Sequence, residues 1–386
     1  MVLELAKMQS DLALVIPKGN SYEAGLVSEI KSLAVGNLKE LYDFVQGDNT
    51  LTPVKAYSSQ RFFVNSVPDF ADVKGQESAK RALLIAAAGM HNVLLIGPPG
   101  GGKTMLARRL PGILPEMQRD EILETTRIYS VAGLLDSSNP LVNQRPFRAP
   151  HKNASSASVI GGGRIPRPGE ISLAQNGVLF LDEFPEFSRD VLEALRQPLE
   201  DKVVTVARAQ ATHTYPANFT LIASMNPCPC GHYGSDLECN CTPPQIQRYL
   251  GRISGPLLDR MDLHVEVPRV NYEQLRDRGN GESSATMREK VMLAREIQKK
   301  RFARYKINLN SQMRPTDVKK YCHLDDESET LLKNAFDKLK MSARAYDRIL
   351  KVARTIADME ASESILLQHL GEALQYRSLD RKYWNS

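Results

Sequence analysis

The residues best suited to chemistry lie in a glycine-rich stretch. It follows an apolar run, Val93 to Ile96, and precedes a helix-forming segment opened by Met105. The stretch fits G-x-x-x-x-G-K-T, in which glycines let backbone N–H groups close around phosphates and the helix N-terminus adds partial positive charge. We expect Lys103 to reach the β- and γ-phosphates of a nucleotide and Thr104 to bind Mg²⁺. The predicted nucleotide-contacting residues are Gly97, Pro98, Pro99, Gly100, Gly101, Gly102, Lys103, Thr104 and Met105.

Two adjacent acidic residues supply the other half of this chemistry. Asp182 and Glu183 directly follow a second apolar run, Val178 to Leu181. An aspartate at a strand end can orient Mg²⁺, and the glutamate beside it can polarise the attacking water. On its own, this pattern is also the ordinary solvated end of a strand. The phosphate-binding loop upstream favours the catalytic interpretation, with Thr104 and Asp182 as Mg²⁺ ligands and Glu183 as the base.

The apolar runs predict the elements that hold these residues. A third run, Phe219 to Ser224, is as short and apolar as the first two. Short apolar strands separated by helices predict an α/β fold with a parallel sheet buried on both faces. After Val270 the strand pattern stops and a separate helical domain is expected. Its predicted helices are residues 286–305, 315–321, 328–339, 343–359 and 364–376.

The N-terminal residues have a weaker pattern. An apolar strand is expected at Leu12 to Ile16, followed by helix-like stretches at 21–33 and 38–45. Residues 49–67 have the composition of a linker. The expected domains are therefore an N-terminal segment at 1–48, the linker at 49–67, the α/β core at 68–270 and the helical domain at 271–386.

The composition is that of a soluble globular protein. Of 386 residues, 42% are hydrophobic and 25% charged, which excludes a disordered chain. The sequence has no apolar run near the ~20 residues that a membrane span needs, and its first residues do not match a secretory signal. We therefore expect a cytoplasmic protein. The net charge of +5 permits nucleic-acid binding without requiring it.

Four of the five cysteines lie on one short segment, as two C-x-C pairs. In a cytosolic chain such a cluster indicates a metal site before disulfides. Four thiolates at ~2.3 Å around a tetrahedral ion suit structural Zn²⁺, and His232 could replace one of them. Reduced cysteines on an ordinary loop are the alternative, since C-x-x-C is the more usual spacing. Cys322 is expected to pack in the helical domain, and the predicted zinc ligands are Cys228, Cys230, Cys239 and Cys241.

The order of these motifs resembles a known family. After the acidic pair come Ala223-Ser224-Met225-Asn226 and then, at 255–263, Gly-Pro-Leu-Leu-Asp-Arg-Met-Asp-Leu. Together they resemble AAA+ ATPases of the magnesium-chelatase and MCM-helicase branch, and most closely the ComM/YifB family. The resemblance extends from about Ser10 to Trp384 and is most specific at 226–231 and 255–260. It implies an AAA+ core with a C-terminal helical lid, ATP and Mg²⁺ as cofactors, and a homo-oligomeric, hexameric ring.

The resemblance also implies roles for single residues. Asn226 matches the sensor-1 residue that helps place the hydrolytic water, and Arg260 matches the arginine finger that acts on a neighbouring subunit's ATP. As alternatives, Asn226 could be a turn residue and Arg260 could form a local ion pair. Arg344 matches the sensor-2 arginine of the lid, and Arg348, one turn along the same face, competes for that role. The adenine-pocket stretch is matched by Asp72, Val73, Gly75 and Gln76.

Two segments carry candidate DNA contacts. Residues 202–206 and 211–215 predict a hairpin, and the resemblance implies that it is the pre-sensor-1 hairpin, which projects into the ring pore of related helicases. The glycine-rich, basic loop at 161–169 lies where this branch inserts a loop into its second helix. Both could contact phosphates, or their arginines could be solvated surface. The candidate DNA-contacting residues are Arg164, Arg167, Lys202 and Arg208.

Residues 14–24 resemble the end of the Lon-protease-like domain that precedes the motor in this family. The serine and lysine of a Lon-type dyad lie upstream of this end in the family and match nothing here. We therefore expect a partial Lon-like α/β fragment in an N-terminally shortened chain, and proteolysis is the weakest functional interpretation.

The resemblance leaves three functions open. The first is an ATP-driven motor on single-stranded or branched DNA, similar to the ComM helicases that promote branch migration during DNA uptake and recombination. The second is a metal-insertion motor like the magnesium-chelatase ATPase subunit, which remodels a partner protein. The third, a remodelling chaperone, would need an aromatic pore loop, whereas the hairpin has Tyr215 only at its base. The four-cysteine loop and the ComM-like stretches favour the DNA motor.

Overall fold

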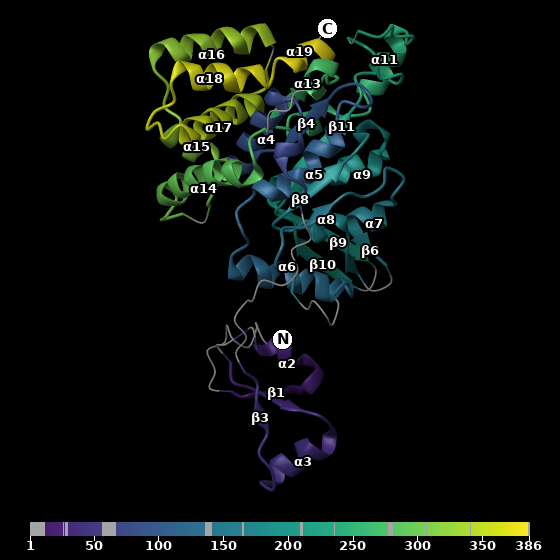
Figure 1. Ribbon diagram of the computed structural model, residues 1–386, viewed down its shortest axis with the longest axis vertical. Helices are drawn as coiled ribbons and strands as arrows, with labels where there is room; N and C mark the ends of the chain where they lie inside the picture. Colours follow the sequence, from purple (N-terminus) through teal and green to yellow (C-terminus); the bar gives the residue numbers. More distant parts are fainter. Residues whose placement is uncertain are drawn as a thin grey trace. The chain divides into compact units, whose positions relative to one another are not determined.

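The computed structural model divides into two compact units, formed by residues 1–65 with 122–143 and by residues 66–121 with 144–386 (Figure 1). The helices after residue 284 thus belong to the same compact unit as the α/β core, whereas residues 122–143 group with the N-terminal segment. The residues that the structure describes are 12–25, 27, 30–55, 67–135, 141–163, 166–208, 211–234, 236–276, 281–305, 307–339 and 341–384.

The N-terminal unit contains a three-stranded sheet. Strand β1 (Leu14–Pro17) is parallel to β2 (Ser32–Val35), and β3 (Thr52–Pro53) pairs antiparallel with β2. The helix expected at 21–33 is wrong, because α2 (Ser21–Gly25) is short and the end of that stretch pairs with β1 instead. The second expected helix is present as α3 (Leu38–Gln46).

A five-stranded parallel sheet forms the core of the second unit, as predicted. Its order is β12-β4-β11-β8-β5, and every neighbouring pair is parallel. Strand β12 has no counterpart among the strands expected from the sequence. The strands are β4 (Val93–Ile96), β5 (Phe147–Arg148), β8 (Val178–Leu181), β11 (Thr220–Met225) and β12 (Leu263–Glu266).

Both faces of this sheet are buried. Val93 and Leu95 of β4 face one apolar cluster, which includes residues of α4 (Glu77–Gly89), α5 (Lys103–Ile113) and several C-terminal helices. Leu94 and Ile96 face the other, with α9 (Arg189–Ala194) and α10 (Arg196–Asp201). Alternate residues of a strand point to opposite faces, so a continuous apolar run is what a doubly covered strand requires.

The C-terminal region is helical, as predicted, and its helices share one core with the sheet. The buried carboxylate of Asp358 accepts hydrogen bonds from Arg301 Nη1 (2.6 Å), Asn310 Nδ2 (2.8 Å) and Arg354 Nε (3.1 Å). The helices are α13 (Tyr272–Arg276), α14 (Ser284–Arg301), α15 (Pro315–Tyr321), α16 (Asp326–Leu339), α17 (Ala343–Met359), α18 (Leu367–Gln375) and α19 (Leu379–Tyr383). The bounds of α15 and α17 are those expected from the sequence.

The remaining elements lie on the connections between strands. Two antiparallel hairpins, β6–β7 and β9–β10, occupy the segments expected to contact DNA. No helix among the described residues is long and apolar enough to cross a membrane. The remaining bounds are α6 (Arg119–Ala132), α7 (Ser156–Ile160), β6 (Gly161–Gly162), β7 (Arg167–Pro168), α8 (Glu170–Leu173), β9 (Val203–Arg208), β10 (Ala211–Pro216), α11 (Pro243–Leu250) and α12 (Gly255–Leu258).

Candidate nucleotide site and its surroundings

The glycine-rich loop joins β4 to α5 and can form only with glycine at several positions. A Cβ at Gly97 would lie 2.0 Å from the carbonyl oxygen of Val267, and a Cβ at Gly101 would lie 2.9 Å from the same atom. Gly100 and Gly102 have φ angles of 77° and 87°, which other residues rarely adopt. The backbone thus forms a tight turn directly before a helix N-terminus, which is the arrangement that holds phosphates.

Lys103 is drawn into this loop. Its Nζ donates hydrogen bonds to the carbonyl oxygens of Gly97 (2.7 Å) and Pro98 (2.9 Å) and to Asn226 Oδ1 (3.2 Å). Burial lowers the pKa of Lys103 to about 8, although the nearby carboxylates of Asp182 and Glu183 raise it. A bound phosphate would add negative charge beside this amine and favour its charged form.

The two expected magnesium ligands lie together. Thr104 Oγ1 donates a hydrogen bond of 2.8 Å to Asp182 Oδ2, and Ser224 Oγ donates to Asp182 Oδ1. One residue comes from the start of α5, the second from the end of β8 and the third from β11. A hydroxyl and a carboxylate at contact distance beside a phosphate loop fit Mg²⁺, which prefers oxygen ligands and substrate phosphates.

Glu183 forms an ion pair that the sequence did not indicate. Its carboxylate binds Lys152 Nζ, and this hydrogen bond raises the pKa of Lys152. Glu183 has a φ angle of 54°, and about half of its side chain is exposed. The carboxylate therefore has to leave Lys152, or share it, in order to polarise a water molecule. Lys152 belongs to no recognised motif and lies 31 residues before Glu183, so sequence reasoning had no signal for the pair.

The stretch expected to line the adenine pocket touches the phosphate loop. Gln76 precedes α4 with a φ angle of 59°, and its Nε2 donates to the carbonyl oxygens of Gly101 (3.1 Å) and Pro268 (2.7 Å). In the same stretch Val73 is buried, Asp72 pairs with Arg109 at 3.6 Å, and Gly75 has a φ angle of 62°.

Arg260 lies at the opposite edge of the sheet from the phosphate loop. Gly97, Asp182 and Asn226 follow the carboxyl ends of β4, β8 and β11, whereas Arg260 precedes the amino end of β12. Leu263 of β12 is paired with Val93, the first residue of β4. A four-residue strand spans about 10 Å, so Arg260 cannot reach the phosphate loop of its own chain. If Arg260 acts on ATP, that ATP belongs to another subunit.

The two sensor-2 candidates, Arg344 and Arg348, lie near Arg260. Ser342, the residue that caps α17, donates to Asp259 Oδ2 at 3.2 Å. The Arg348 side chain already has partners within its own chain: it pairs with Asp262 and donates a hydrogen bond of 3.0 Å to the Arg260 carbonyl oxygen. Arg344, in the first turn of α17, is exposed. Arg344 is thus the more available cation, and it too lies away from the phosphate loop of its own chain.

The four cysteines form a compact cluster, the only such group of possible metal ligands among the described residues. The sulfur of Cys228 lies 3.3 Å from that of Cys230 and 3.8 Å from that of Cys239, and Cys230 and Cys239 are 3.6 Å apart. Sulfurs at ~2.3 Å from a tetrahedral ion lie about 3.8 Å apart, so the cluster fits zinc. Burial raises the pKa of the Cys230 thiol, but hydrogen bonds with the His232 N–H and with the other three thiols lower it to about 6.

The cysteine loop touches the nucleotide site. A Cβ at Gly231 would lie 2.6 Å from Pro99 of the phosphate loop and 3.8 Å from the Asn226 side chain. On the other side of the loop, the ring of Tyr233 contacts that of Tyr383 in α19. A metal that holds this loop in shape therefore also supports the phosphate loop.

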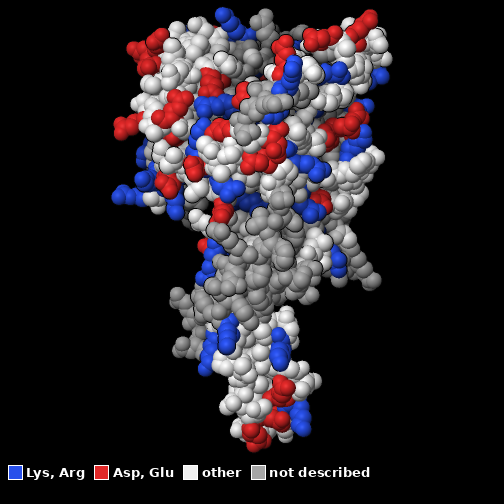
Figure 2. Space-filling view, viewed as in Figure 1, with Lys and Arg blue, Asp and Glu red and all other residues white. Residues whose placement is uncertain are grey.

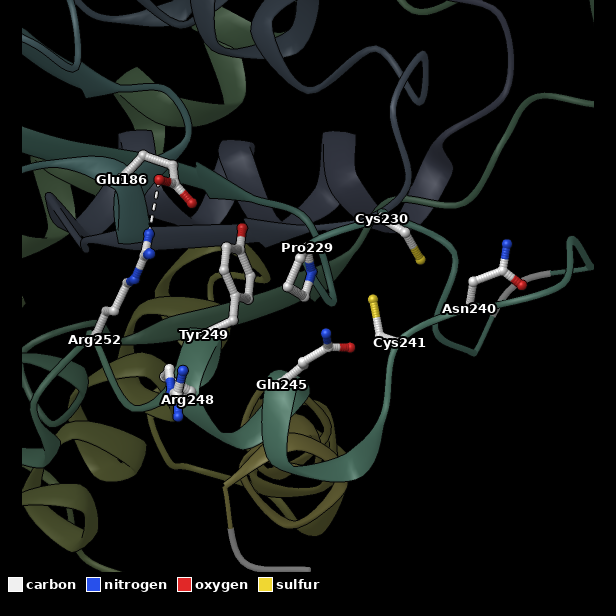
Figure 3. A pocket seen from close by; sticks show the side chains of 9 residues that line it. All are labelled: Glu186, Pro229, Cys230, Asn240, Cys241, Gln245, Arg248, Tyr249 and Arg252. Carbon is white, nitrogen blue, oxygen red and sulfur yellow. Dashed lines mark ion pairs between the residues drawn. The ribbon is translucent and has the colours of Figure 1, made fainter.

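A cavity of about 480 Å³ opens beside the cysteines (Figure 3). Cys230 and Cys241 lie on one side of it, and Tyr249, Arg248 and Arg252 on the other. Arg252 is paired with Glu186 at 2.7 Å, drawn as a dashed line in the figure. Because two thiols line the cavity, a chelator could reach a bound metal from it.

The two candidate DNA-binding segments meet in space. Tyr215 Oη donates a hydrogen bond of 2.8 Å to the Pro166 carbonyl oxygen, and a Cβ at Gly161 would lie 3.0 Å from Val206 Cγ2. Figure 1 shows β6, β9 and β10 side by side accordingly. Hairpins that are far apart in sequence thus form one surface, and Arg167 is exposed on it.

Of the other three expected DNA contacts, the structure describes the side chain of Lys202 alone. Lys202 lies at the base of the β9–β10 hairpin, where burial lowers its pKa to about 8. This position disfavours the expected phosphate contact, because the amine lies among Asp262, Arg348 and Lys351 of its own chain. Arg164 and the side chain of Arg208 lie outside the described residues.

Comparisons with known proteins agree with the resemblance. The family model described as "Magnesium chelatase, subunit ChlI" matches residues 69–275, and the model of its C-terminal domain matches 281–377. The chain is 48% identical to the competence protein ComM of Haemophilus influenzae, covering 98% of this chain and 74% of that protein. It is 45% identical to YifB of Escherichia coli, covering 97% and 72%. It is also 22% identical to the DNA replication licensing factor mcm6 of Dictyostelium discoideum, covering 92% and 40%.

Replacing Glu183 tests the chemistry of the site. In Glu183→Gln the magnesium ligands remain but the carboxylate that polarises water is lost, so ATP should still bind while turnover falls by about 10²- to 10⁴-fold. Glu186→Gln is the matched control. Glu186 lies three residues after Glu183, but it pairs with Arg252 and should be dispensable for hydrolysis. Near-native ATP hydrolysis by Glu183→Gln would contradict this assignment.

The cysteine cluster predicts about one zinc ion per chain in purified protein. The metal should be lost in the Cys228→Ser/Cys230→Ser double variant, and ATP binding should weaken with it because the loop packs on Pro99. Cys322→Ser, which changes the cysteine outside the cluster, should keep the metal. Elemental analysis and ATP titration measure both effects, and a metal-free protein with full activity would rule the site out.

Proposed function

The chain belongs to the magnesium-chelatase family of AAA+ ATPases, together with ComM and YifB, and we propose that it is a ring motor that uses ATP hydrolysis to act on DNA. The observation that supports DNA most directly is the meeting of the β6–β7 and β9–β10 hairpins through Tyr215 and Pro166. Two loops that converge on one surface, with Arg167 exposed on it, offer a place where a DNA backbone can bind.

In this proposal each active site is shared by two subunits. In one subunit the phosphate loop holds ATP, Asp182 orients Mg²⁺ and Glu183 polarises the water. Bound Mg²⁺ would supply positive charge that stabilises the negative charge developing on the transferring phosphoryl group. Asn226 helps to place the water and already contacts Lys103 at 3.2 Å. Arg260 of the neighbouring subunit completes the site, since it lies too far from the phosphate loop of its own chain. This requirement favours a closed ring, for which we propose a hexamer.

The surface charge in view favours local DNA binding. On the face shown in Figure 2, lysines and arginines are interspersed with aspartates and glutamates. The net charge of +5 is also mild. We therefore propose that a small number of cations on the two hairpins contact phosphates, and that these contacts set the orientation of the strand without reading its sequence.

The finer proposal is a helicase that promotes branch migration in recombination or natural transformation. It is supported by the 48% identity to a protein named as a competence protein. The alternative is a motor that remodels a partner protein, and it is favoured by the match to models named for the magnesium chelatase subunit. Stimulation of ATP hydrolysis by DNA separates the two.

The DNA proposal predicts that Arg167→Ala weakens binding to all sequences about equally. The slope of log affinity against log salt concentration should become shallower by ~1, the value for one lost phosphate contact. ATP affinity should not change. Lys319→Ala, which removes an exposed cation of α15, is the matched control and should leave the salt slope intact. If a protein that assembles and hydrolyses ATP binds no forked or four-way DNA, protein remodelling becomes the better proposal.

A further inference from the structure

Both terminal nitrogens of the Arg260 guanidinium have partners within its own chain. Its Nη2 pairs with the carboxylate of Glu200, and its Nη1 donates to the Pro256 carbonyl oxygen at 2.7 Å. Only 8% of the Arg260 side chain is exposed, against 55% of Glu200. Arginine stays charged at all accessible pH values. A second anion, such as a phosphate, can therefore compete with Glu200 for it.

The main chain at Arg260 is fixed more firmly than its side chain. The Arg260 carbonyl oxygen accepts hydrogen bonds from Asn92 Nδ2 and Arg348 Nη1, both at 3.0 Å. Two residues on, the buried carboxylate of Asp262 accepts the Asn92 N–H at 2.8 Å and pairs with Arg348. The backbone is thus held to the sheet and to α17. Any change in what Arg260 contacts has to come from its side chain or from Glu200.

Glu200 connects Arg260 to the β9–β10 hairpin. It lies in the last turn of α10, which ends at Asp201, and β9 begins at Val203. Between them Lys202 has a φ angle of 58°, and its carbonyl oxygen accepts the Ala217 N–H at 2.8 Å, which closes the base of the hairpin. Glu200 lies only two residues before Lys202, so a displacement of the hairpin is transmitted through Lys202 to α10 and to the Glu200 carboxylate.

We infer that Glu200 is a latch that keeps Arg260 from the neighbouring subunit's ATP until the β9–β10 hairpin moves. This inference rests on the proposed function, in which Arg260 acts in trans and the hairpin contacts DNA. When DNA shifts the hairpin, Glu200 withdraws, and the guanidinium exchanges a carboxylate for the γ-phosphate of the adjoining site. Glu200 is a positioning residue: it acts through Arg260 and touches neither ATP nor DNA.

The test is Glu200→Gln, which keeps the size of the side chain and removes its charge. Without DNA, its kcat for ATP should rise about two- to fivefold, the effect expected for losing a partly exposed ion pair. The affinity for ATP should change little, because an arginine finger acts mainly on the charge that develops in the transition state. Added DNA should then stimulate Glu200→Gln less than the wild type.

Two further variants separate a latch from a merely structural ion pair. Glu193→Gln removes the partly exposed partner of Arg196 on the neighbouring helix α9 and should leave basal kcat and DNA stimulation as in the wild type. In the Arg260→Ala/Glu200→Gln double variant the gain should disappear, since the effect passes through Arg260. Light scattering on each variant checks that assembly is retained.

The outcomes distinguish this inference from the function on which it rests. If DNA stimulates the wild type and the basal kcat of Glu200→Gln is unchanged or lower, the latch is refuted while the DNA motor stands. If basal kcat rises through Arg260 but DNA stimulates neither protein, the latch stands and another ligand moves the hairpin. A gain that persists in the double variant refutes the latch in either case.

Discussion

The parallel pairing of β4 with β11 and β12 is the constraint on which the site depends. Because the strands run the same way, their carboxyl ends collect the phosphate loop, Asp182 and Asn226 at one edge of the sheet. The same pairing puts Arg260 at the other edge, since Leu263 is in register with the first residue of β4. The sheet that brings the phosphate loop, Asp182 and Asn226 together thereby separates them from Arg260. In the proposed mechanism, a second copy of the chain supplies this arginine.

Regions outside the phosphate loop are coupled to this arrangement by contacts. The cysteine loop packs through Gly231 on Pro99, so a metal bound by the cysteines would also constrain the turn that would hold the phosphates. At the opposite edge, Glu200 links Arg260 to the hairpin base, and Arg348 links the Arg260 backbone to the helical region. In the proposed motor, nucleotide binds at one edge of the sheet, and the contacts of Arg260 at the other edge depend on the hairpin.

Sequence reasoning succeeded where the signal is local and failed where it is not. The strands β4 and β8 were predicted because a buried parallel strand has to be continuously apolar. The sequence of β12 breaks that rule with His264, which is buried beside Asp380 of α19, so this strand was missed. The cysteine cluster follows from spacing alone. The ion pairs of Glu183 and Arg260 join segments 31 and 60 residues apart and belong to no motif. The helix expected at 21–33 was lost to strand pairing, in which tertiary contacts override local preference.

The most direct measurement of the shared site mixes two inactive variants. Lys103→Ala subunits cannot hold ATP but carry an intact Arg260, and Arg260→Ala subunits hold ATP but lack the arginine. If the site is shared, each variant alone is inactive, and mixing restores ATP hydrolysis at hybrid interfaces, about one interface in four in an equal mixture with random neighbours. Absence of rescue at every ratio, with both variants still assembling together, would contradict a site completed by the neighbouring subunit.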